Sequence, residues 1–119
     1  MKTNPLKDKS LDFAIQIVNA TRELQKSQKE YILSKQLMRS GTAIGALYCE
    51  AEQAESRADF IHKLAIAQME CNESLYWLEL LERTNLMDKN EYEKLEPPCR
   101  ELIRLLTSII RTAKKYQMS

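Results

Sequence analysis

The fold of this chain is decided by a stretch that begins Gln36-Leu37-Met38-Arg39-Ser40-Gly41-Thr42-Ala43-Ile44-Gly45. Apolar and small side chains recur in it at heptad-like spacing, which predicts a helix that lies against its neighbours at a shallow angle. Gly41 and Gly45 stand four residues apart on one side of this helix, where each glycine costs about 1 kcal/mol relative to alanine. We therefore expect tight helix packing at this pair, with a ligand approaching the bare backbone as the alternative.

The same stretch continues into a second helix that carries more apolar surface than one core face needs. Ser56-Arg57-Ala58-Asp59 is a serine cap with an acid three residues on, so we expect a helix to begin there. Its core face is Phe60, Leu64, Ala67, Cys71, Leu75 and Leu78. Tyr76, Trp77 and Leu80 lie elsewhere around the same helix, and we expect them, or a second apolar surface on the first helix, to form an oligomer interface.

Toward the N-terminus, the stripe Phe13, Ile17, Ala20 and Leu24 predicts a helix from Pro5 to about Gln25. A capping box of Ser27 with Glu30 is then expected to start the next helix, which ends near Ala54.

Toward the C-terminus, Asp88 with Glu91 predicts a capped short helix that reaches about Leu95. The pair Pro97-Pro98 should kink or break the chain, because proline removes a donor and disfavours helical geometry in the residue before it. The last helix is expected from about Pro98 to Gln117.

These elements define the expected fold class. A chain of 119 residues fits one domain, residues 1–119. Two glycines and three prolines are too few for a sheet with many turns. Short connections favour an all-α, antiparallel up-and-down four-helix bundle, with the last helix kinked or broken near Pro97-Pro98.

Charge is segregated along the chain, although the net charge is only +1. The segment 50–96 is acidic and the segments on both sides of it are basic. A cationic stripe of Arg100, Arg104, Arg111 and Lys115 follows one side of the last helix. This stripe could contact RNA phosphates, and the alternative is ion pairing with the acidic segment.

The sequence offers little support for a catalytic or metal site, and we expect a non-enzyme without cofactor, metal or small-molecule substrate. His62 is the single histidine, and the pairs Glu70 with Glu73 and Glu79 with Glu82 have no histidine partner of the kind used in di-metal bundles. Three widely spaced cysteines suggest neither disulfides nor zinc.

No apolar run approaches the roughly 20 residues that span a bilayer, and the first residues lack the apolar core of a signal peptide. We expect a soluble, cytoplasmic protein that does not bind membranes.

The motifs above, together with Glu50-Ala51, Lys63-Leu64, Ile66-Ala67 and Thr107-Ser108-Ile109-Ile110, resemble the bacterial family named for the protein encoded in 23S ribosomal RNA intervening sequences. The resemblance extends from about Ser10 to Lys115. It implies an up-and-down bundle that assembles as a homopentamer, without established enzymatic activity.

The resemblance also leaves a second function open. A related branch comprises accessory proteins of diversity-generating retroelements, which work with a reverse transcriptase. An RNA-binding or ribosome-associated adaptor, or an accessory protein to a reverse transcriptase, is therefore the alternative function.

One departure from the family pattern affects the second helix. Relatives usually carry Asn where this chain has Leu47, whereas the Glu of the pattern remains as Glu50. If Glu50 lies in the interior it needs a partner, and Arg39, Ser40 and Thr42 are the candidates.

Overall fold

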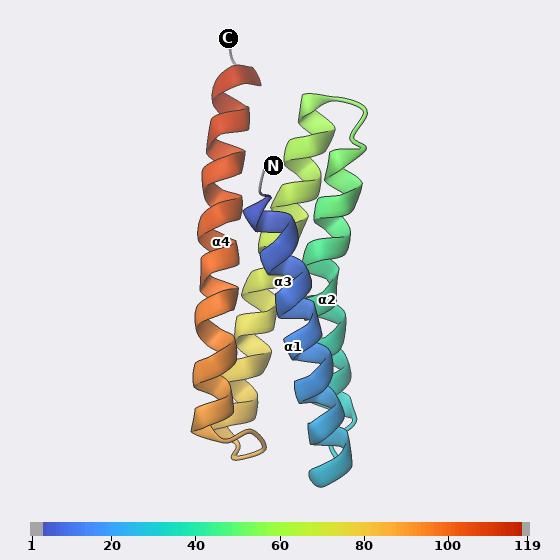
Figure 1. The fold of residues 1–119 in the computed structure, drawn as a ribbon, viewed down its shortest axis with the longest axis vertical. Helices are drawn as coiled ribbons and strands as arrows, with labels where there is room; N and C mark the ends of the chain where they lie inside the picture. The colour runs from blue at the N-terminus through green and yellow to red at the C-terminus, as the bar shows by residue number, and fades with distance from the viewer. Residues whose placement is uncertain (1–3, 118–119) are drawn as a thin grey trace.

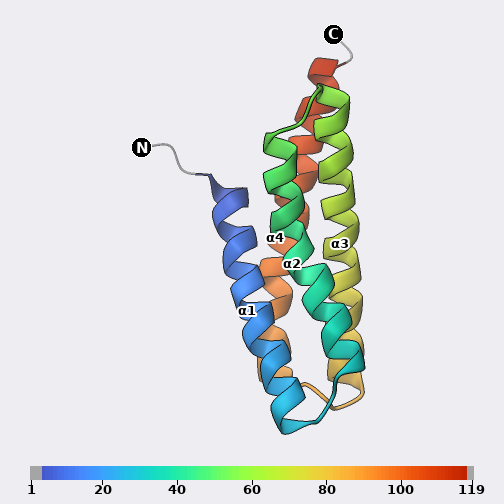
Figure 2. The same cartoon turned by 90° about the vertical axis from the view of Figure 1, so that its right-hand side faces the viewer.

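The computed structural model describes residues 4–117 and contains four helices in antiparallel succession (Figure 1). They are α1 (Pro5–Ser27), α2 (Ile32–Glu52), α3 (Arg57–Arg83) and α4 (Lys89–Gln117). Each helix packs against the next, and α1 also packs against α4, so that α1 and α3 occupy diagonal corners of the bundle (Figure 2). The expected up-and-down four-helix bundle is confirmed.

Helix α1 begins where its sequence predicts and ends later than predicted. The Asn4 side chain accepts a hydrogen bond from the backbone N–H of Lys7, and Pro5 occupies the first turn, where its missing donor is harmless. At the other end, the Ser27 hydroxyl donates to the carbonyl of Glu23 within the helix. The expected capping box of Ser27 with Glu30 is therefore wrong.

Glu30 caps α2 on its own. Its carboxylate accepts hydrogen bonds from the backbone N–H groups of Ile32, Leu33 and Ser34, at 3.2, 3.1 and 2.7 Å. These groups lack partners inside the helix, which is why a carboxylate at this end is stabilising. Helix α2 consequently starts at Ile32 rather than at Ser27.

The caps expected for the last two helices are present. Ser56 Oγ accepts a hydrogen bond from the N–H of Asp59, and Asp88 Oδ1 accepts one from the N–H of Glu91. Both acceptors satisfy donors that the first helical turn leaves unpaired. Helices α3 and α4 thus begin as the sequence indicates.

Helix α4 runs without interruption through Pro97 and Pro98, so the expected break is wrong. The two prolines leave the carbonyls of Glu93 and Lys94 without their usual donors. Both of those residues are exposed, so water can satisfy the carbonyls. On the opposite side, Leu95, Cys99 and Leu102 are buried in the core and hold the helix to α3 on either side of the prolines.

Small residues bring α1, α2 and α3 close together. A Cβ added to Gly41 would lie 2.9 Å from both Cγ atoms of Ile17, and one added to Gly45 would lie 3.1 Å from Ser10 Oγ. Across the other side of α2, Ser74 Oγ donates to Ser40 Oγ at 2.9 Å. These contacts fix how far along the bundle each of the three helices sits relative to the others.

Candidate functional site

The most conspicuous surface is an apolar strip along the outer side of α3. We call it the α3 face, and it comprises Ile66, Met69, Tyr76, Trp77 and Leu80. Met69 and Tyr76 are 67% and 59% exposed, and the other three are half-buried. The core side of the same helix is already filled by Leu64, Ala67, Cys71 and Leu78. Of the residues predicted to form an interface, Tyr76 is exposed and Leu80 is half-buried, whereas Trp77 is half-buried and packs against the edge of the core.

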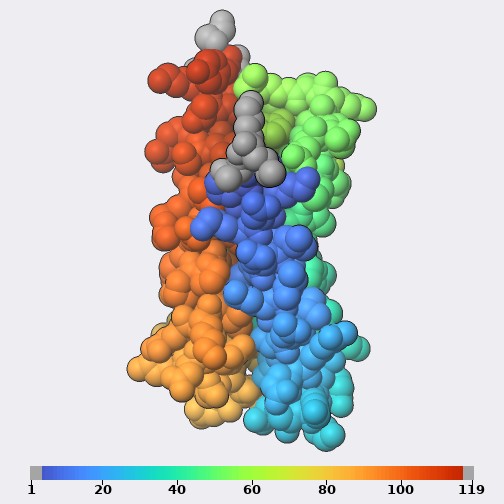
Figure 3. Space-filling view, viewed as in Figure 1, coloured from blue at the N-terminus to red at the C-terminus, as the bar shows by residue number. Residues whose placement is uncertain are grey.

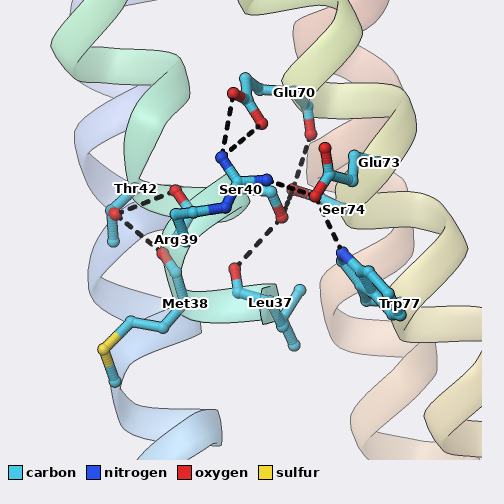
Figure 4. A network of polar contacts seen from close by, with 9 residues as sticks. All are labelled: Leu37, Met38, Arg39, Ser40, Thr42, Glu70, Glu73, Ser74 and Trp77. Atoms are coloured by element: carbon cyan, nitrogen blue, oxygen red, sulfur yellow. Dashed lines mark hydrogen bonds and ion pairs between the residues drawn. The ribbon is translucent and has the colours of Figure 1, made fainter. Parts of the chain in front are cut away.

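A polar network borders the α3 face and fixes the orientation of Trp77 (Figure 4). Arg39 of α2 forms ion pairs with Glu70, at 3.3 Å, and with Glu73. Glu73 Oε1 also accepts a hydrogen bond from the Trp77 indole N–H at 3.2 Å, and the Tyr76 ring packs edge-on against Trp77 with centroids 5.2 Å apart. Each charge in this part of the face therefore already has a partner within the subunit.

The ion pair between Arg39 and Glu73 shifts the pKa of each residue in the direction that favours its charged form. The hydrogen bond from Arg39 is the largest influence that lowers the pKa of Glu73, and the bond from Trp77 adds to it. The same contact with Glu73 raises the pKa of Arg39 further above its usual value. Arg39 and Glu73 are consequently both charged at neutral pH.

A second apolar strip lies on the outer side of α1. We call it the α1 face, and it comprises Leu11, Ile15 and Val18, spaced four and three residues apart. Leu11 is 61% exposed and Ile15 is 52% exposed. Figure 3 shows α1 on the front surface of the molecule, with α4 beside it and no described segment lying over it. An interface on the first helix or the third is expected from the sequence, but the stronger stripe through Phe13 and Ile17 masks the spacing of Leu11, Ile15 and Val18, so these residues are not singled out there.

The predicted cationic residues of α4 are all exposed. Arg100 donates to Glu96 at 2.8 Å within the helix. Arg104, Arg111 and Lys115 form no ion pair with residues 4–117, so the expected pairing with the acidic segment is limited to Arg100. Of the four stripe residues, Arg104, Arg111 and Lys115 are therefore exposed cations without an ion pair among residues 4–117.

Glu50 and Leu47 occupy different environments. Glu50 is on the surface, where it forms an ion pair with Lys63 of α3 at 3.3 Å. Arg39, Ser40 and Thr42 are engaged elsewhere. Leu47 is half-buried and packs against the core, so an aliphatic side chain fits this position. Because Glu50 is not buried, its carboxylate needs no partner in the interior of the bundle.

The groups that could perform nucleophilic chemistry are dispersed. Cys71 and Cys99 are buried and Cys49 is exposed, and all three are free thiols. Cys99 Sγ donates to the carbonyl of Cys71 at 3.4 Å. The pKa of Cys71 is raised by its hydrogen bond with Cys99 and by burial, which disfavours the reactive thiolate. His62 is exposed on the outer side of α3.

A hollow of about 610 Å³ lies between the C-terminal end of α1 and the α3–α4 turn (Figure 3). Leu24 and Met87 line its apolar part, and Glu23, Glu82 and Asp88 line its polar part. Within the described chain, no group of three or more His, Cys, Asp or Glu side chains is arranged to hold a metal ion. No helix in residues 4–117 is long and apolar enough to cross a membrane.

Comparison with known proteins identifies the family of this helical bundle. The sequence pattern of the 23S rRNA-intervening sequence protein family matches residues 2–108. The chain belongs to this family. A crystal structure of a protein of unknown function from the S23 ribosomal protein family of Bacteroides thetaiotaomicron VPI-5482 is similar, with 55% identity and a TM-score of 0.87. The match covers 88% of this chain and 97% of that one. No curated protein matches the chain.

Proposed function

We propose that this protein is a non-enzymatic assembly protein that forms a homo-oligomer, most simply the pentamer implied by its family resemblance. The observation that carries the proposal is the apolar surface on α1 and α3, where Leu11, Ile15, Met69 and Tyr76 are each more than half exposed. Exposed apolar surface on a helix face marks interaction sites in soluble proteins.

The chemistry of the remaining surface supports a role without catalysis. The buried thiol with a raised pKa is a poor nucleophile, and the single histidine is remote from it on the outer side of the bundle. We place the protein in the cytoplasm, because free cysteines persist where thiols are kept reduced.

Mass measurement in solution tests the proposal. Light scattering at micromolar concentration should give about five times the chain mass of 13.9 kDa. A dimer or another closed oligomer would retain the assembly role and correct the subunit number. A strict monomer under these conditions would remove the proposal.

A second candidate function is favoured by the unpaired cations of α4. We propose as the alternative that Arg104, Arg111 and Lys115, with Arg100, contact the phosphates of a structured RNA, as in a ribosome-associated adaptor or an accessory to a reverse transcriptase. The names of the family and of the similar structure, which refer to ribosomal RNA and a ribosomal protein, support testing RNA first.

The RNA hypothesis predicts a loss of binding when the stripe is removed. Replacing all four stripe residues by Ala should weaken binding to a structured 23S fragment and lower the slope of log affinity against log salt by about 3. The matched control removes four exposed cations from the other end of the bundle, namely Arg22, Lys26, Lys29 and Lys35. Equal binding by the stripe variant and the native protein would eliminate the stripe.

A further inference from the structure

The core between α3 and α4 contains a pair of thiols that neither proposed function uses. Cys71 of α3 and Cys99 of α4 are both fully buried, on antiparallel helices that pack against each other (Figure 1). Cys99 Sγ donates to the carbonyl of Cys71 at 3.4 Å, and the two thiols are also hydrogen bonded to each other. The two sulfur atoms are therefore neighbours, although 28 residues separate them along the chain.

The closed bundle keeps this pair unreactive. Thiols in hydrogen-bond contact can form a disulfide when rotation of the side chains brings their sulfur atoms together. The reactive form of a cysteine is the thiolate, and the hydrogen bond with Cys99, together with burial, raises the pKa of Cys71 and disfavours that form. Oxidation of the pair consequently requires the two helices to separate for a moment.

The prolines beside Cys99 make α4 easiest to open at this point. Pro97 and Pro98 directly precede Cys99, and each lacks the N–H that would close one backbone hydrogen bond of the helix. Of residues 89–96, which precede the prolines in α4, only Leu95 is buried. A segment with few buried contacts and missing hydrogen bonds opens locally more often than the rest of a bundle.

We propose that Cys71 and Cys99 are a redox-sensitive pair. A transient opening of α4 at Pro97-Pro98 admits a hydroperoxide, which converts the two thiols to a disulfide that links α4 covalently to α3. The cross-link spans 28 residues of chain, so it restricts the unfolded state and stabilises the folded bundle. It also prevents the opening by which it formed, until a reductant breaks it.

The reaction balances with hydrogen peroxide as the oxidant. The Cys99 thiolate attacks one peroxide oxygen, the O–O bond breaks, and the departing hydroxide takes up the thiol proton and leaves as water. When α4 closes, the Cys71 sulfur attacks the sulfenic sulfur of Cys99, and the sulfenic oxygen leaves as water with the Cys71 proton. Two thiols and one peroxide give one disulfide and two waters.

The mass of the intact chain tests the pair. The reference is Cys49→Ser, which removes the exposed thiol and the disulfides it could form between molecules. Hydrogen peroxide should remove two hydrogen atoms from this variant without adding oxygen, and peptide mapping without reductant should join Cys71 to Cys99. The oxidised protein should unfold at higher urea concentration than the reduced protein.

A matched control removes one member of the pair. Cys71→Ala in the same background should gain oxygen on treatment with peroxide and should lose no hydrogen, while circular dichroism confirms that its helices persist. Gain of oxygen by the Cys49→Ser reference, without the loss of two hydrogen atoms, would overturn the proposed pair.

The rate of disulfide formation tests where the bundle opens. Pro97→Ala in the Cys49→Ser background restores a backbone N–H beside the pair and favours the helix, so the disulfide should form about tenfold more slowly. Gly41→Ala is the control, because it weakens the contact between α1 and α2 and leaves the backbone of α4 unchanged. An unchanged rate in Pro97→Ala, or a faster rate in Gly41→Ala, would overturn opening at the prolines.

Discussion

At the scale of single residues, Gly41 shows how an absent side chain determines helix packing. The Cγ atoms of Ile17 occupy the space that a Cβ at Gly41 would need, so α1 approaches the backbone of α2 directly. Gly45 meets only the hydroxyl of Ser10 at a comparable distance, which is a softer contact. The spacing of the two glycines predicts a close neighbour, but nothing in the sequence reveals that this neighbour is Ile17.

Gly41→Ala should destabilise the fold by about 1 kcal/mol. Overpacking against Ile17 costs about 1–3 kcal/mol, and the better helix propensity of alanine recovers about 1 kcal/mol. Urea unfolding measures the change. In an Ile17→Ala background the two Cγ contacts at 2.9 Å are gone and only the Cβ contact at 3.2 Å remains, so the same substitution should become less destabilising or neutral. A loss of equal size in both backgrounds would contradict this explanation.

The network around Trp77 predicts a pH dependence with a definite sign. Arg39 lowers the pKa of Glu73 in the folded state, so the stabilisation it gives is present above the usual pKa of a Glu, about 4.3, and is lost as the pH falls through the lower folded value. Trp77 is the only tryptophan, and its indole bonds Glu73, so its fluorescence reports this protonation. The native midpoint should lie below about 4.3.

Removing the cation provides the comparison. In Arg39→Met the fluorescence midpoint should rise toward the usual value for Glu, while far-UV circular dichroism confirms that the helices persist over the same pH range. Glu73→Gln should abolish the transition. An unchanged midpoint in Arg39→Met would show that Arg39 does not govern this carboxylate. Sequence reasoning missed the network because Arg39 and Glu73 are brought together only when α2 packs on α3.

At the scale of the elements, the helices follow from their apolar periodicity, whereas their ends depend on contacts that the sequence only partly specifies. The stripe through Phe13 and Ile17 predicts α1, and the caps Ser56 and Asp88 predict the starts of α3 and α4. Ser27 resembles a cap by spacing, yet the chain leaves α1 after it, and Glu30 takes the capping role. Which of these two residues caps α2 depends on where the turn between α1 and α2 lies over the core.

Helix α4 provides a test of how its prolines are tolerated. Pro97→Ala restores the missing N–H opposite the Glu93 carbonyl, and alanine is favoured over proline by about 3 kcal/mol inside a helix. The proline stiffens the unfolded chain, which offsets about 1 kcal/mol of this gain. Urea unfolding should therefore show a stabilisation of about 2 kcal/mol. A destabilised Pro97→Ala would mean that the proline ring itself makes a needed contact.

At the scale of the whole molecule, the bundle separates its apolar and cationic surfaces onto different helices. The apolar faces belong to α1 and α3, and the cationic stripe belongs to α4. The apolar periodicity of α3 is enough to indicate surplus apolar surface on that helix. The diagonal arrangement of α1 and α3 requires the bundle, because it depends on the order in which four helices pack.

Salt distinguishes the two surfaces. Contact between apolar faces should be insensitive to ionic strength, so the oligomer mass should be the same in about 0.1 M and about 1 M NaCl. RNA binding through the α4 stripe should fall steeply over the same range. An oligomer that dissociates in high salt would indicate an interface held by ion pairs instead.

The hydrogen bond between Ser40 and Ser74 fixes how α2 and α3 are aligned along their contact. Sliding either helix by one turn, about 5.4 Å, would separate the two hydroxyls and break the hydrogen bond between them. Both partners are uncharged hydroxyls, so neither acid nor added salt should break this hydrogen bond. The two helices therefore keep one alignment, and every copy of the protein presents the same arrangement of exposed side chains to a neighbouring molecule.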